Sequence, residues 1–334
     1  MRAVVLVGGF GTRLRPLTSD LPKQMLPIVD RPMIEHVVGH LAAHGVEEVV
    51  LSLGFLPDAF RDAYSDGRCA GIPLHYAVEP EPLDTAGAIR FAAEDAGIDE
   101  AFLVLNGDVL TDLAVDELIG FHRASGAEAT VSLTPVDDPS RYGVVPIDAD
   151  GRVTGFVEKP SAGAAPCNWI NAGTYVFEPS AIDRIEPGRR VSVEREVFPA
   201  MADEGVLYGL RSEAYWVDTG TPETYLGVQL DLLDGVRGPA RSAVDDAAEI
   251  HPGATVRRSV IGPGAVVAEG SRVCNSVVMA GSRIGEGAVV DGSLVGIDAT
   301  IGPDAQVLGL SVVGHGAEVV AGEHLTGDCR PEQG

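Results

Sequence analysis

Short apolar runs alternate with amphipathic stretches along the first third of the chain. Four of these runs are predicted to be buried strands, the first ending in two glycines: Arg2–Val7, Glu48–Leu53, Pro73–Val78 and Ala101–Leu105. Helical spacing is found between them, at Pro32–His44, Pro57–Tyr64 and Thr85–Asp95. This alternation predicts a mostly parallel α/β sheet with crossover helices, in which ligands bind at the carboxyl ends of the strands.

After about residue 126 the pattern changes to shorter strands. These are predicted at Ala129–Pro135, Val144–Ile147, Arg152–Val157 and Thr174–Phe177. Ser192 is then expected to cap a helix that carries two glutamates in its first turn. Thr221 followed by Pro222 predicts a second capped helix, which runs to about Leu233.

The last 80 or so residues contain a repeat with a period of 17. Three columns of this repeat hold only Ile or Val: 250, 267, 284 and 301; 256, 273, 290 and 307; and 261, 278, 295 and 312. Small residues form a fourth column at 254, 271, 288 and 305, and Gly or Asp occupies the predicted corners at 253, 270, 287 and 304. One inward β-branched residue per side predicts a triangular coil, which is typical of the left-handed β-helix of hexapeptide repeats.

These patterns divide the chain into four parts. We expect an α/β domain over residues 1–235, a linker over 236–248, a β-helix over 249–325 and a tail over 326–334. The exposed edges and flat sides of a β-helix favour assembly of several copies through it.

Charge and cysteine content exclude several classes of protein. The chain has 24 basic and 49 acidic residues, and its net charge of −25 would repel nucleic acid. Its four cysteines are scattered and form no CxxC pair, which favours free thiols in a reducing compartment. No apolar run is long enough for a signal peptide or a membrane span. We therefore expect a cytoplasmic protein with no membrane association.

Lysine is almost absent from the sequence. Lys23 and Lys159 are the only two, and every other basic side chain is arginine. Chance explains such a distribution, but so does a need for a compact ammonium group that the planar guanidinium does not replace.

The first strand runs into the segment Gly8-Gly9-Phe10-Gly11-Thr12-Arg13, and Pro22-Lys23 follows it. A glycine loop after a strand brings backbone N–H groups close to phosphates. The segment lacks the terminal Gly-Lys-Ser/Thr of a P-loop and the third glycine of the dinucleotide fingerprint. A tight strand–helix turn with surface arginines is the structural alternative, and the cations close behind the glycines favour a triphosphate site.

Five motifs occur in a fixed order: GGFGTRLRPLT with Pro22-Lys23, LNGD at 105–108, FVEKP at 156–160, INAG at 170–173 and WVDTG at 216–220. Together they resemble the sugar-1-phosphate nucleotidylyltransferases over essentially the whole chain, and many members also carry a C-terminal β-helix. The segments SVEREVFP at 192–199 and PLDTAG at 82–87 are most similar to the mannose-1-phosphate guanylyltransferase branch. The resemblance implies a Rossmann-like nucleotidyltransferase domain that transfers a nucleotidyl group from a nucleoside triphosphate to a sugar 1-phosphate.

The resemblance also implies roles for individual residues. Expected nucleotide contacts are Leu6, Gly8, Gly9, Gly11, Thr12, Arg13, Lys23, Glu79, Pro82, Thr85 and Gly87. Expected sugar-phosphate contacts are Gly143, Glu158, Lys159, Asn171 and Gly173. Asp108 and Asp218 are expected to bind Mg²⁺, and the expected catalytic residues are Arg13, Lys23, Lys159 and Asp108.

Glu79 follows the strand from which the family reads the base. A carboxylate only accepts hydrogen bonds, so it suits the adjacent N1–H and N2 amino group of guanine better than uracil or thymine. The expected substrates are therefore GTP and mannose 1-phosphate. Alternatively, backbone groups of the loop at 83–87 choose the base, and Asp84 stands in that loop where the family usually has glycine.

Three other functions remain possible on the sequence alone. The first is a glucose-1-phosphate thymidylyl- or uridylyltransferase, and the second is a regulatory homologue that binds a nucleotide sugar without catalysis. The presence of all five expected phosphate and metal residues argues against the second. The third is an acyltransferase activity of the β-helix through its histidines 251, 315 and 324, for which surface or corner histidines are the simpler explanation.

Overall fold

The computed structural model describes residues 1–161, 163–241 and 243–331, and the chain divides into two compact units. The sheet unit comprises Met1–Gly9 and Ile34–Trp216. The β-helix unit comprises Phe10–Met33 and Val217–Gly334, so it includes the segment that follows the first strand.

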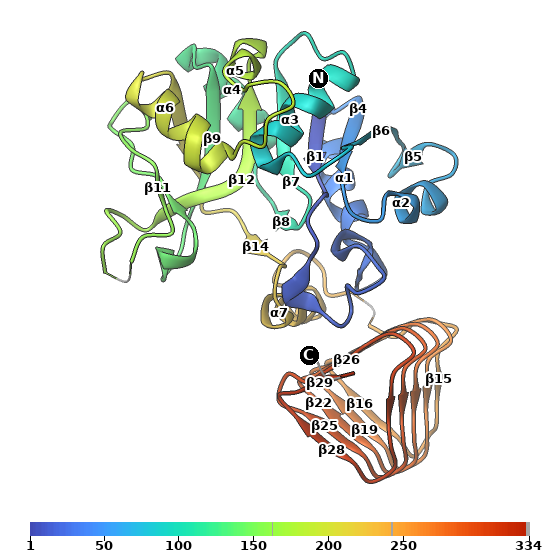
Figure 1. Ribbon diagram of the computed structural model, residues 1–334. Helices are drawn as coiled ribbons and strands as arrows, with labels where there is room; N and C mark the ends of the chain where they lie inside the picture. Colours follow the sequence, from blue (N-terminus) through green and yellow to red (C-terminus); the bar gives the residue numbers. More distant parts are fainter. Residues whose placement is uncertain (162, 242, 332–334) are drawn as a thin grey trace. The chain divides into compact units, whose positions relative to one another are not determined.

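The sheet unit is built on a ten-stranded mixed sheet (Figure 1). Its strands lie in the order β11 (Val157–Glu158), β10 (Gly143–Val144), β12 (Trp169–Phe177), β7 (Phe102–Asn106), β1 (Arg2–Leu6), β4 (Glu48–Leu53), β6 (Ile72–Val78) and β5 (Arg68–Cys69). In addition, β9 (Ala129–Pro135) pairs with β12 and with β13 (Leu207–Arg211). The strands β7, β1, β4 and β6 are parallel neighbours, so their carboxyl ends lie at one edge.

Helices cover this sheet and bury its apolar side chains. They are α1 (Met33–Ala43), α2 (Pro57–Ala63), α3 (Asp84–Asp95), α4 (Val115–Ser125), α5 (Pro179–Asp183), α6 (Phe198–Asp203) and one π-helical turn η4 (Val193–Val197). In the core, Ile89 of α3 is fully buried together with Val4 of β1 and Val50 of β4. Ser192 caps η4 by accepting a hydrogen bond from the backbone N–H of Arg195, as its sequence predicted.

The predicted parallel strands and their helices are confirmed to within about one residue. Two of the later strands are wrong as predicted. The segment 144–147 forms a strand only up to Val144, because Pro146 has no N–H to continue a ladder. Likewise 152–157 has only bridges at Arg152 and Val153 before the two-residue β11. Helix α4 has no counterpart among the helices expected from the sequence.

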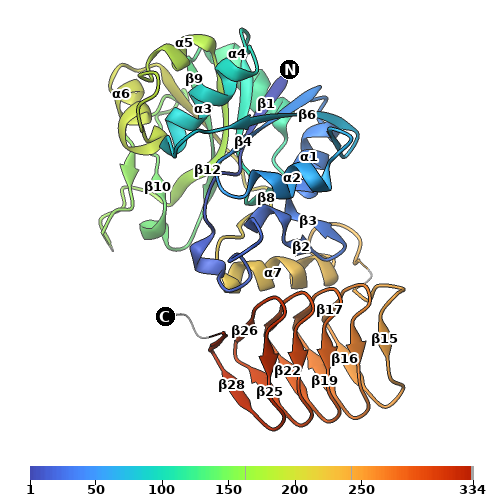
Figure 2. The same ribbon diagram turned by 45° about the vertical axis from the view of Figure 1, so that its right-hand side comes forward.

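The β-helix consists of three five-stranded parallel sheets, consistent with the predicted left-handed β-helix (Figure 2). The first contains Glu249–Ile250, Val266–Val267, Arg283–Ile284, Thr300–Ile301 and Glu318–Val319 (β15, β18, β21, β24, β27). The second contains Thr255–Arg257, Arg272–Cys274, Val289–Asp291, Gln306–Leu308 and His324–Thr326 (β16, β19, β22, β25, β28). The third contains Val260–Ile261, Val277–Val278, Leu294–Val295, Val312–Val313 and Cys329–Arg330 (β17, β20, β23, β26, β29).

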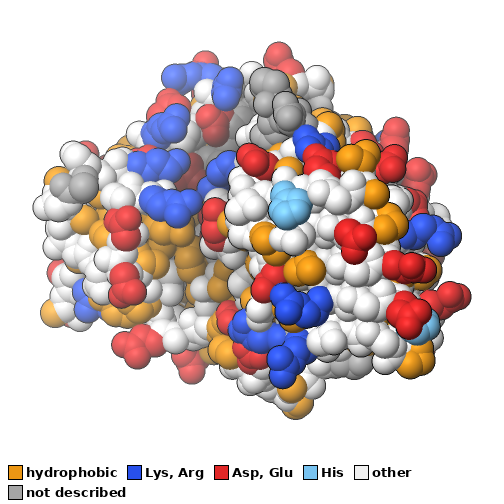
Figure 3. Space-filling model, turned by 90° about the horizontal axis from the view of Figure 1, so that it is seen from below, with side chains coloured by type: hydrophobic (Ala, Val, Ile, Leu, Met, Phe, Trp, Pro, Cys, Tyr) orange, Lys and Arg blue, Asp and Glu red, His pale blue; other side chains and the backbone are white. Residues whose placement is uncertain are grey.

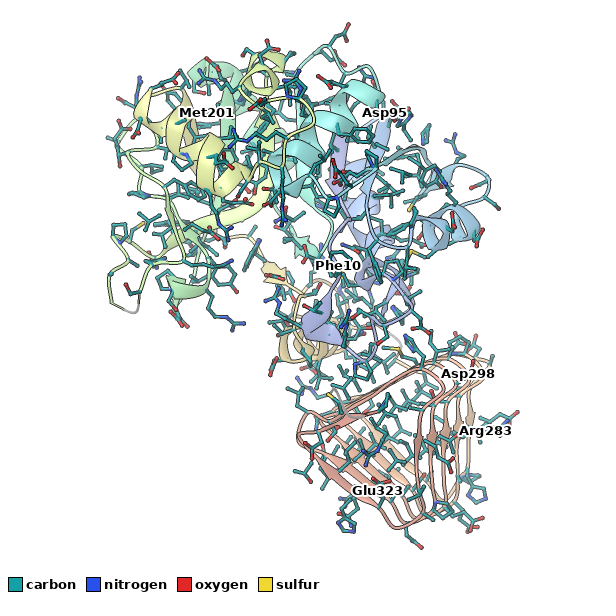
Figure 4. The ribbon with its side chains drawn as sticks, viewed as in Figure 1. Phe10, Asp95, Met201, Arg283, Asp298 and Glu323 are labelled. Carbon is teal, nitrogen blue, oxygen red and sulfur yellow. The ribbon has the colours of Figure 1, made fainter. Side chains whose placement is uncertain are left out.

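Side chains alternate between the inside and the outside of this coil. The inward valines and isoleucines form one buried cluster, whereas Arg283 extends outward (Figure 4). The third predicted column is wrong at its last member, because Val295 pairs with Val313 and not with Val312. The turn Leu308-Gly309-Leu310-Ser311 has one residue more than its counterpart Asp291-Gly292-Ser293, which shifts all later positions by one.

The rest of the β-helix unit consists of the segment 10–33 and the chain around helix α7 (Pro222–Leu233). The segment contains the short helices η1 (Thr12–Leu14) and η2 (Lys23–Met25) and the hairpin β2 (Pro27–Ile28)–β3 (Arg31–Pro32). Thr221 and Thr224 form a capping box at the start of α7. Buried Gln229 of α7 donates to the carbonyl of Pro27 (2.8 Å) and accepts from the N–H of Val29 (2.6 Å), which fixes the hairpin.

Acidic side chains are scattered over the face of the molecule shown in Figure 3, as expected for a solvated surface of high negative charge. In the described part of the chain, no helix is long and apolar enough to cross a membrane.

Candidate functional site

Glu79 lies at the carboxyl ends of β1, β4 and β6. Its Oε1 accepts a hydrogen bond from the hydroxyl of buried Ser52 (3.2 Å), and its Oε2 accepts from the N–H of Leu83 (3.0 Å). Gly8 lies against it, since a Cβ atom added at Gly8 would be 3.4 Å from Oε1. Burial raises the pKa of Glu79 above the usual glutamate value, and the two hydrogen bonds oppose this shift. Sequence reasoning missed Ser52, although a polar residue inside the apolar strand β4 was a signal.

The loop after Glu79 has an unusual backbone at Asp84. This residue has φ = 61°, in the left-handed region that glycine adopts most easily. The family preference for glycine at this position therefore has a conformational reason, and aspartate keeps the same backbone shape. The carboxylate of Asp84 accepts from the N–H of Thr85 (2.9 Å) and lies 3.7 Å from Arg190. Exposed Pro82 belongs to the same loop.

Thr85 and Gly87, in the first turn of α3, form hydrogen bonds with Val191 and with the first residues of η4. The Thr85 hydroxyl donates to Glu194 (2.7 Å) and accepts from the N–H of Val193 (2.8 Å). Backbone N–H of Gly87 donates to the carbonyl of Val191. These contacts fix the base loop to the chain segment 191–194, which is a role that the sequence did not indicate for Glu194.

Asp108 follows a tight turn at the end of β7. Its neighbour Gly107 donates to the carbonyl of Leu6 (3.0 Å), and a Cβ atom there would lie 2.6 Å from Val7 and 2.9 Å from the Leu6 oxygen. Only glycine allows this approach, which brings the Asn106–Asp108 turn against the end of β1. Asp108 therefore lies at the same edge of the sheet as Gly8 and Gly9.

Three residues that were predicted to contact the sugar phosphate lie together at the outer strands β10 and β11. Gly143 is the direct antiparallel partner of Glu158, and the side chain of Lys159 lies 3.2 Å from the Glu158 carboxylate. The Lys159 N–H donates to the carbonyl of Tyr142 (3.0 Å). Its side chain is 60% exposed, so its ammonium is accessible to a phosphate from solvent.

Asn171 and Gly173 form a bulge in β12, where the register against β9 shifts. The Asn171 side chain accepts from the N–H of Gly173 (2.9 Å) and donates to the Tyr175 hydroxyl (2.9 Å). Tyr175 is fully buried, and burial raises its pKa, so its hydroxyl remains protonated. A hydrogen-bond network of neutral groups thus stabilises the bulge.

Trp216 makes a further contact with the same bulge. Its Nε1–H donates to the carbonyl of Ala172 (2.8 Å), and its ring meets that of Tyr142 edge-on at 5.7 Å. Trp216 therefore contacts both the bulge and the residue that binds the Lys159 backbone. The WVDTG motif contains this tryptophan, but sequence reasoning used only its aspartate.

The segment 10–33 holds the two predicted cations of the phosphate site. Gly11 has φ = 60°, and a Cβ atom there would lie 3.3 Å from both Lys23 and Thr18. The buried Thr18 hydroxyl donates to the carbonyl of Gly11 (2.8 Å), which closes the turn. Thr12 begins η1 and Arg13 follows it, both exposed. Phe10, 53% exposed, marks the point where the chain leaves β1 and Gly9 (Figure 4).

Asp218 and Arg13 flank Gly220. The Gly220 N–H donates to Oδ1 of Asp218 (2.8 Å), and a Cβ atom added at this glycine would lie 2.8 Å from that oxygen and 2.5 Å from Nη2 of Arg13. Asp218 ends strand β14 (Trp216–Asp218), and Thr221 follows as the cap of α7. The capped helix fixes this carboxylate at its amino-terminal side.

A divalent cation would find few protein ligands here. Among the described residues, no group of three or more His, Cys, Asp or Glu side chains could hold a metal ion. Mg²⁺ does not need such a group, because it is usually bound by one or two carboxylates together with substrate phosphates and water.

Comparisons with known proteins identify the family of the chain. The family model for nucleotidyl transferase matches residues 2–235, and the model for the GMPPB C-terminal domain matches residues 239–329. The chain is 44% identical over 261 residues to a mannose-1-phosphate guanylyltransferase of Mycobacterium tuberculosis, covering 75% of this chain and 72% of the relative. A mannose-1-phosphate guanyltransferase of Schizosaccharomyces pombe is 40% identical over 270 residues, covering 78% and 74%.

Crystal structures of HddC from Yersinia pseudotuberculosis, one of them complexed with GMP-PN, superimpose with a TM-score of 0.59 at 31% identity. They cover 68% of this chain and 97% of HddC.

Proposed function

Since the chain belongs to the nucleotidyl transferase family, we propose that it transfers the guanylyl group of GTP to mannose 1-phosphate, giving GDP-mannose and pyrophosphate. The proposal is carried by 44% identity with a mannose-1-phosphate guanylyltransferase over three quarters of the chain. The expected phosphate and metal residues are all present, which supports an active enzyme over a regulatory homologue: Arg13, Lys23, Asp108, Lys159 and Asp218.

In the proposed reaction, a phosphate oxygen of mannose 1-phosphate attacks the α-phosphorus of GTP in line, and pyrophosphate leaves. Such a transfer depends on positioning and charge neutralisation and needs no covalent intermediate. Arg13 and Lys23 would hold the triphosphate and the departing pyrophosphate. Lys159, whose ammonium is exposed, would bind the attacking sugar phosphate, and Glu158, Asn171 and the backbone of Gly143 and Gly173 would orient the sugar.

Asp108 and Asp218 would hold Mg²⁺. When bound, this ion would neutralise charge on the phosphate oxygens and orient them for attack. The carboxylate of Asp218 is kept in place by the N–H of Gly220, so its position does not depend on a ligand.

Glu79 is proposed to read the guanine base. A carboxylate has about four acceptor positions, of which the Ser52 hydroxyl and the Leu83 N–H use two. The remaining positions suit the N1–H and N2 amino donors of guanine, whereas a uracil or thymine carbonyl would face a half-buried acceptor. Leu6, Gly8, Gly9 and Thr12 would contact the nucleotide from the loop after β1, and Pro82, Thr85 and Gly87 belong to the base loop.

The test is Glu79→Gln, assayed with GTP, UTP and dTTP by release of pyrophosphate. We expect wild type to prefer GTP and the substitution to reduce that preference by about tenfold or more, because an amide nitrogen replaces one acceptor. Ser52→Ala is the matched control, since it removes a contact of Glu79 but keeps the carboxylate. A GTP preference that is absent in wild type, or that survives in Glu79→Gln, would contradict the proposed reader.

We also propose that the protein acts in the cytoplasm as a homo-oligomer assembled through the β-helix. All four cysteines are free thiols, which suits a reducing compartment. Val320, in the last coil, is 55% exposed and adds apolar surface to a β-helix with open edges. Light scattering on the purified protein should give a mass above that of one chain, and a monomer at every concentration would exclude the assembly.

A further inference from the structure

One corner of the β-helix reaches the segment that carries Arg13 and Lys23. His315 follows β26, and its Nε2 lies 2.9 Å from the carbonyl oxygen of Leu17. The same ring accepts a hydrogen bond at Nδ1 from the backbone N–H of Ile297 (2.8 Å). Both partners belong to the β-helix unit, although Leu17 is 298 positions away in the chain.

These two contacts define the state of the ring. Because Nδ1 accepts from an amide, the proton of the neutral imidazole is on Nε2, which donates to Leu17. Burial lowers the pKa of His315, and the nearby Asp20 and Asp298 together with the Leu17 bond oppose the shift. The ring therefore bridges two backbones as a neutral group.

The position of His315 is distinctive among the coils. The residues at the same corner in the three preceding coils are Pro263, Ala280 and Ile297, none of which has a polar side chain. The corner is also tightly packed, since a Cβ atom added at Gly314 would lie 3.0 Å from Pro16. Of these four corners, the one at His315 therefore carries a polar side chain, and that side chain contacts the segment 10–33.

From Leu17 a short chain of contacts leads to the phosphate residues. The next residue, Thr18, is fully buried and donates its hydroxyl proton to the carbonyl of Gly11. Gly11 packs against Lys23 and is followed by Thr12 and Arg13. Leu17 N–H donates to Leu14, and Leu14 N–H donates to Gly11, so the turn is a single hydrogen-bonded unit.

We propose that His315 is a positioning residue for triphosphate binding, through which the β-helix fixes the turn Gly11–Thr18. This inference rests on the proposed function of Arg13 and Lys23 as the triphosphate site. It gives the β-helix a part in substrate binding in addition to assembly. The effect concerns phosphates and not the base, so it should be the same for every triphosphate that binds.

The experiment measures binding of GTP, UTP and ATP with Mg²⁺ by titration calorimetry, together with KM for GTP and for mannose 1-phosphate. His315→Leu should weaken the binding of each triphosphate whose affinity is measurable by about tenfold, the usual consequence of losing one or two hydrogen bonds. KM for mannose 1-phosphate should stay within about twofold of the wild-type value. His315→Gln should recover part of the loss, because its amide can still donate to Leu17. His324→Leu is the matched control, since His324 is exposed in the neighbouring coil.

A second measurement follows triphosphate affinity against pH in wild type and in His315→Gln. Protonation of His315 would place an N–H on Nδ1 opposite the N–H of Ile297, so the triphosphate affinity of wild type should fall as the pH drops through the lowered pKa. His315→Gln should lack this part of the acid-side loss and keep only the part that is due to Glu79. Unchanged triphosphate affinity in a folded His315→Leu, or equal losses for both substrates, would overturn the inference. If His315→Leu does not fold, an acid-side loss of equal size in wild type and in His315→Gln would overturn it. If the proposed reaction is wrong, wild type will show no turnover of GTP and mannose 1-phosphate. The comparison of triphosphate binding between wild type and the variants can still be made in that case.

Discussion

The two compact units contain different parts of the proposed site. The sheet unit holds Glu79 with its base loop, and it holds the residues around Lys159 that are proposed to bind the sugar phosphate. Both sets lie on strands of one sheet or directly after them. The β-helix unit holds Arg13 and Lys23 in the short helices η1 and η2, and Asp218 at the end of β14. In the proposed function, recognition of the base and sugar would thus depend on the packing of a sheet, whereas recognition of the triphosphate would depend on contacts with the β-helix.

The largest effect should come from the two carboxylates, one from each unit. Asp108→Asn or Asp218→Asn should lower kcat by about 10²–10³, because charge on the phosphates is no longer offset through the metal. Asp246→Asn, which changes an exposed carboxylate, is the control. Initial rates of pyrophosphate release across a Mg²⁺ titration measure the effect. Full activity of Asp218→Asn would remove this residue from the metal site.

The two lysines should separate the units kinetically. Lys23→Ala should raise KM for GTP, and Lys159→Ala should raise KM for mannose 1-phosphate, each by about 10–100-fold for a lost charged hydrogen bond. Lys159→Arg should also be impaired, since a planar fork replaces a point charge. Steady-state kinetics with each substrate varied in turn provide the measurement. Wild-type behaviour of Lys159→Arg would show that lysine is not required there.

A smaller effect is expected within the sheet unit at Trp216. Trp216→Phe removes the N–H that binds Ala172 but keeps a ring next to Tyr142, so KM for mannose 1-phosphate should rise by about two- to tenfold. KM for GTP should not change. Trp169→Phe makes the same substitution in β12 and should leave both constants unchanged. Equal changes in the two constants would mean that Trp216 acts only on folding.

The smallest effect concerns the ionisation of Glu79. Its pKa is raised by burial, so the carboxylate is charged above that raised value and gains a proton as the pH falls through it. Affinity for GTP should therefore be constant at neutral pH and decline on the acid side, starting above the usual glutamate pKa of 4.5. Measuring GTP binding between about pH 8 and about pH 5 tests this, and Glu79→Gln should lack that step. An acid-side loss of the same size in both proteins would assign it to another group.

The sequence predicted those parts of the fold that depend on local periodicity. The strand–helix alternation and the columns of Ile and Val are visible in the chain because each repeats at a fixed spacing. The register after Leu310 was not predictable in the same way, since Val312 and Val313 both fit the column and only pairing decides between them. Helix α4 was missed because buried His122 interrupts its apolar face.

For the site, the motifs identified residues but not the contacts that support them. Glu79, Lys159 and Asn171 were named from the sequence, whereas Ser52, Tyr142 and Trp216 are known only from the contacts they make. The inclusion of segment 10–33 in the β-helix unit could not be predicted, because it depends on contacts such as His315–Leu17 between distant positions. Long-range pairing of this kind leaves no periodic trace in a single sequence.

The additional residue at Leu310 shows how a coil of this β-helix can change its number of residues. Ile301 pairs with Val319 and Val307 with Leu325, both 18 positions apart, and the spacing returns to 17 between Val313 and Arg330. Because each coil contacts only its neighbours, the turn absorbs the insertion and no inward side chain is displaced. A turn of this β-helix can therefore gain or lose a residue while the buried columns of inward side chains continue uninterrupted.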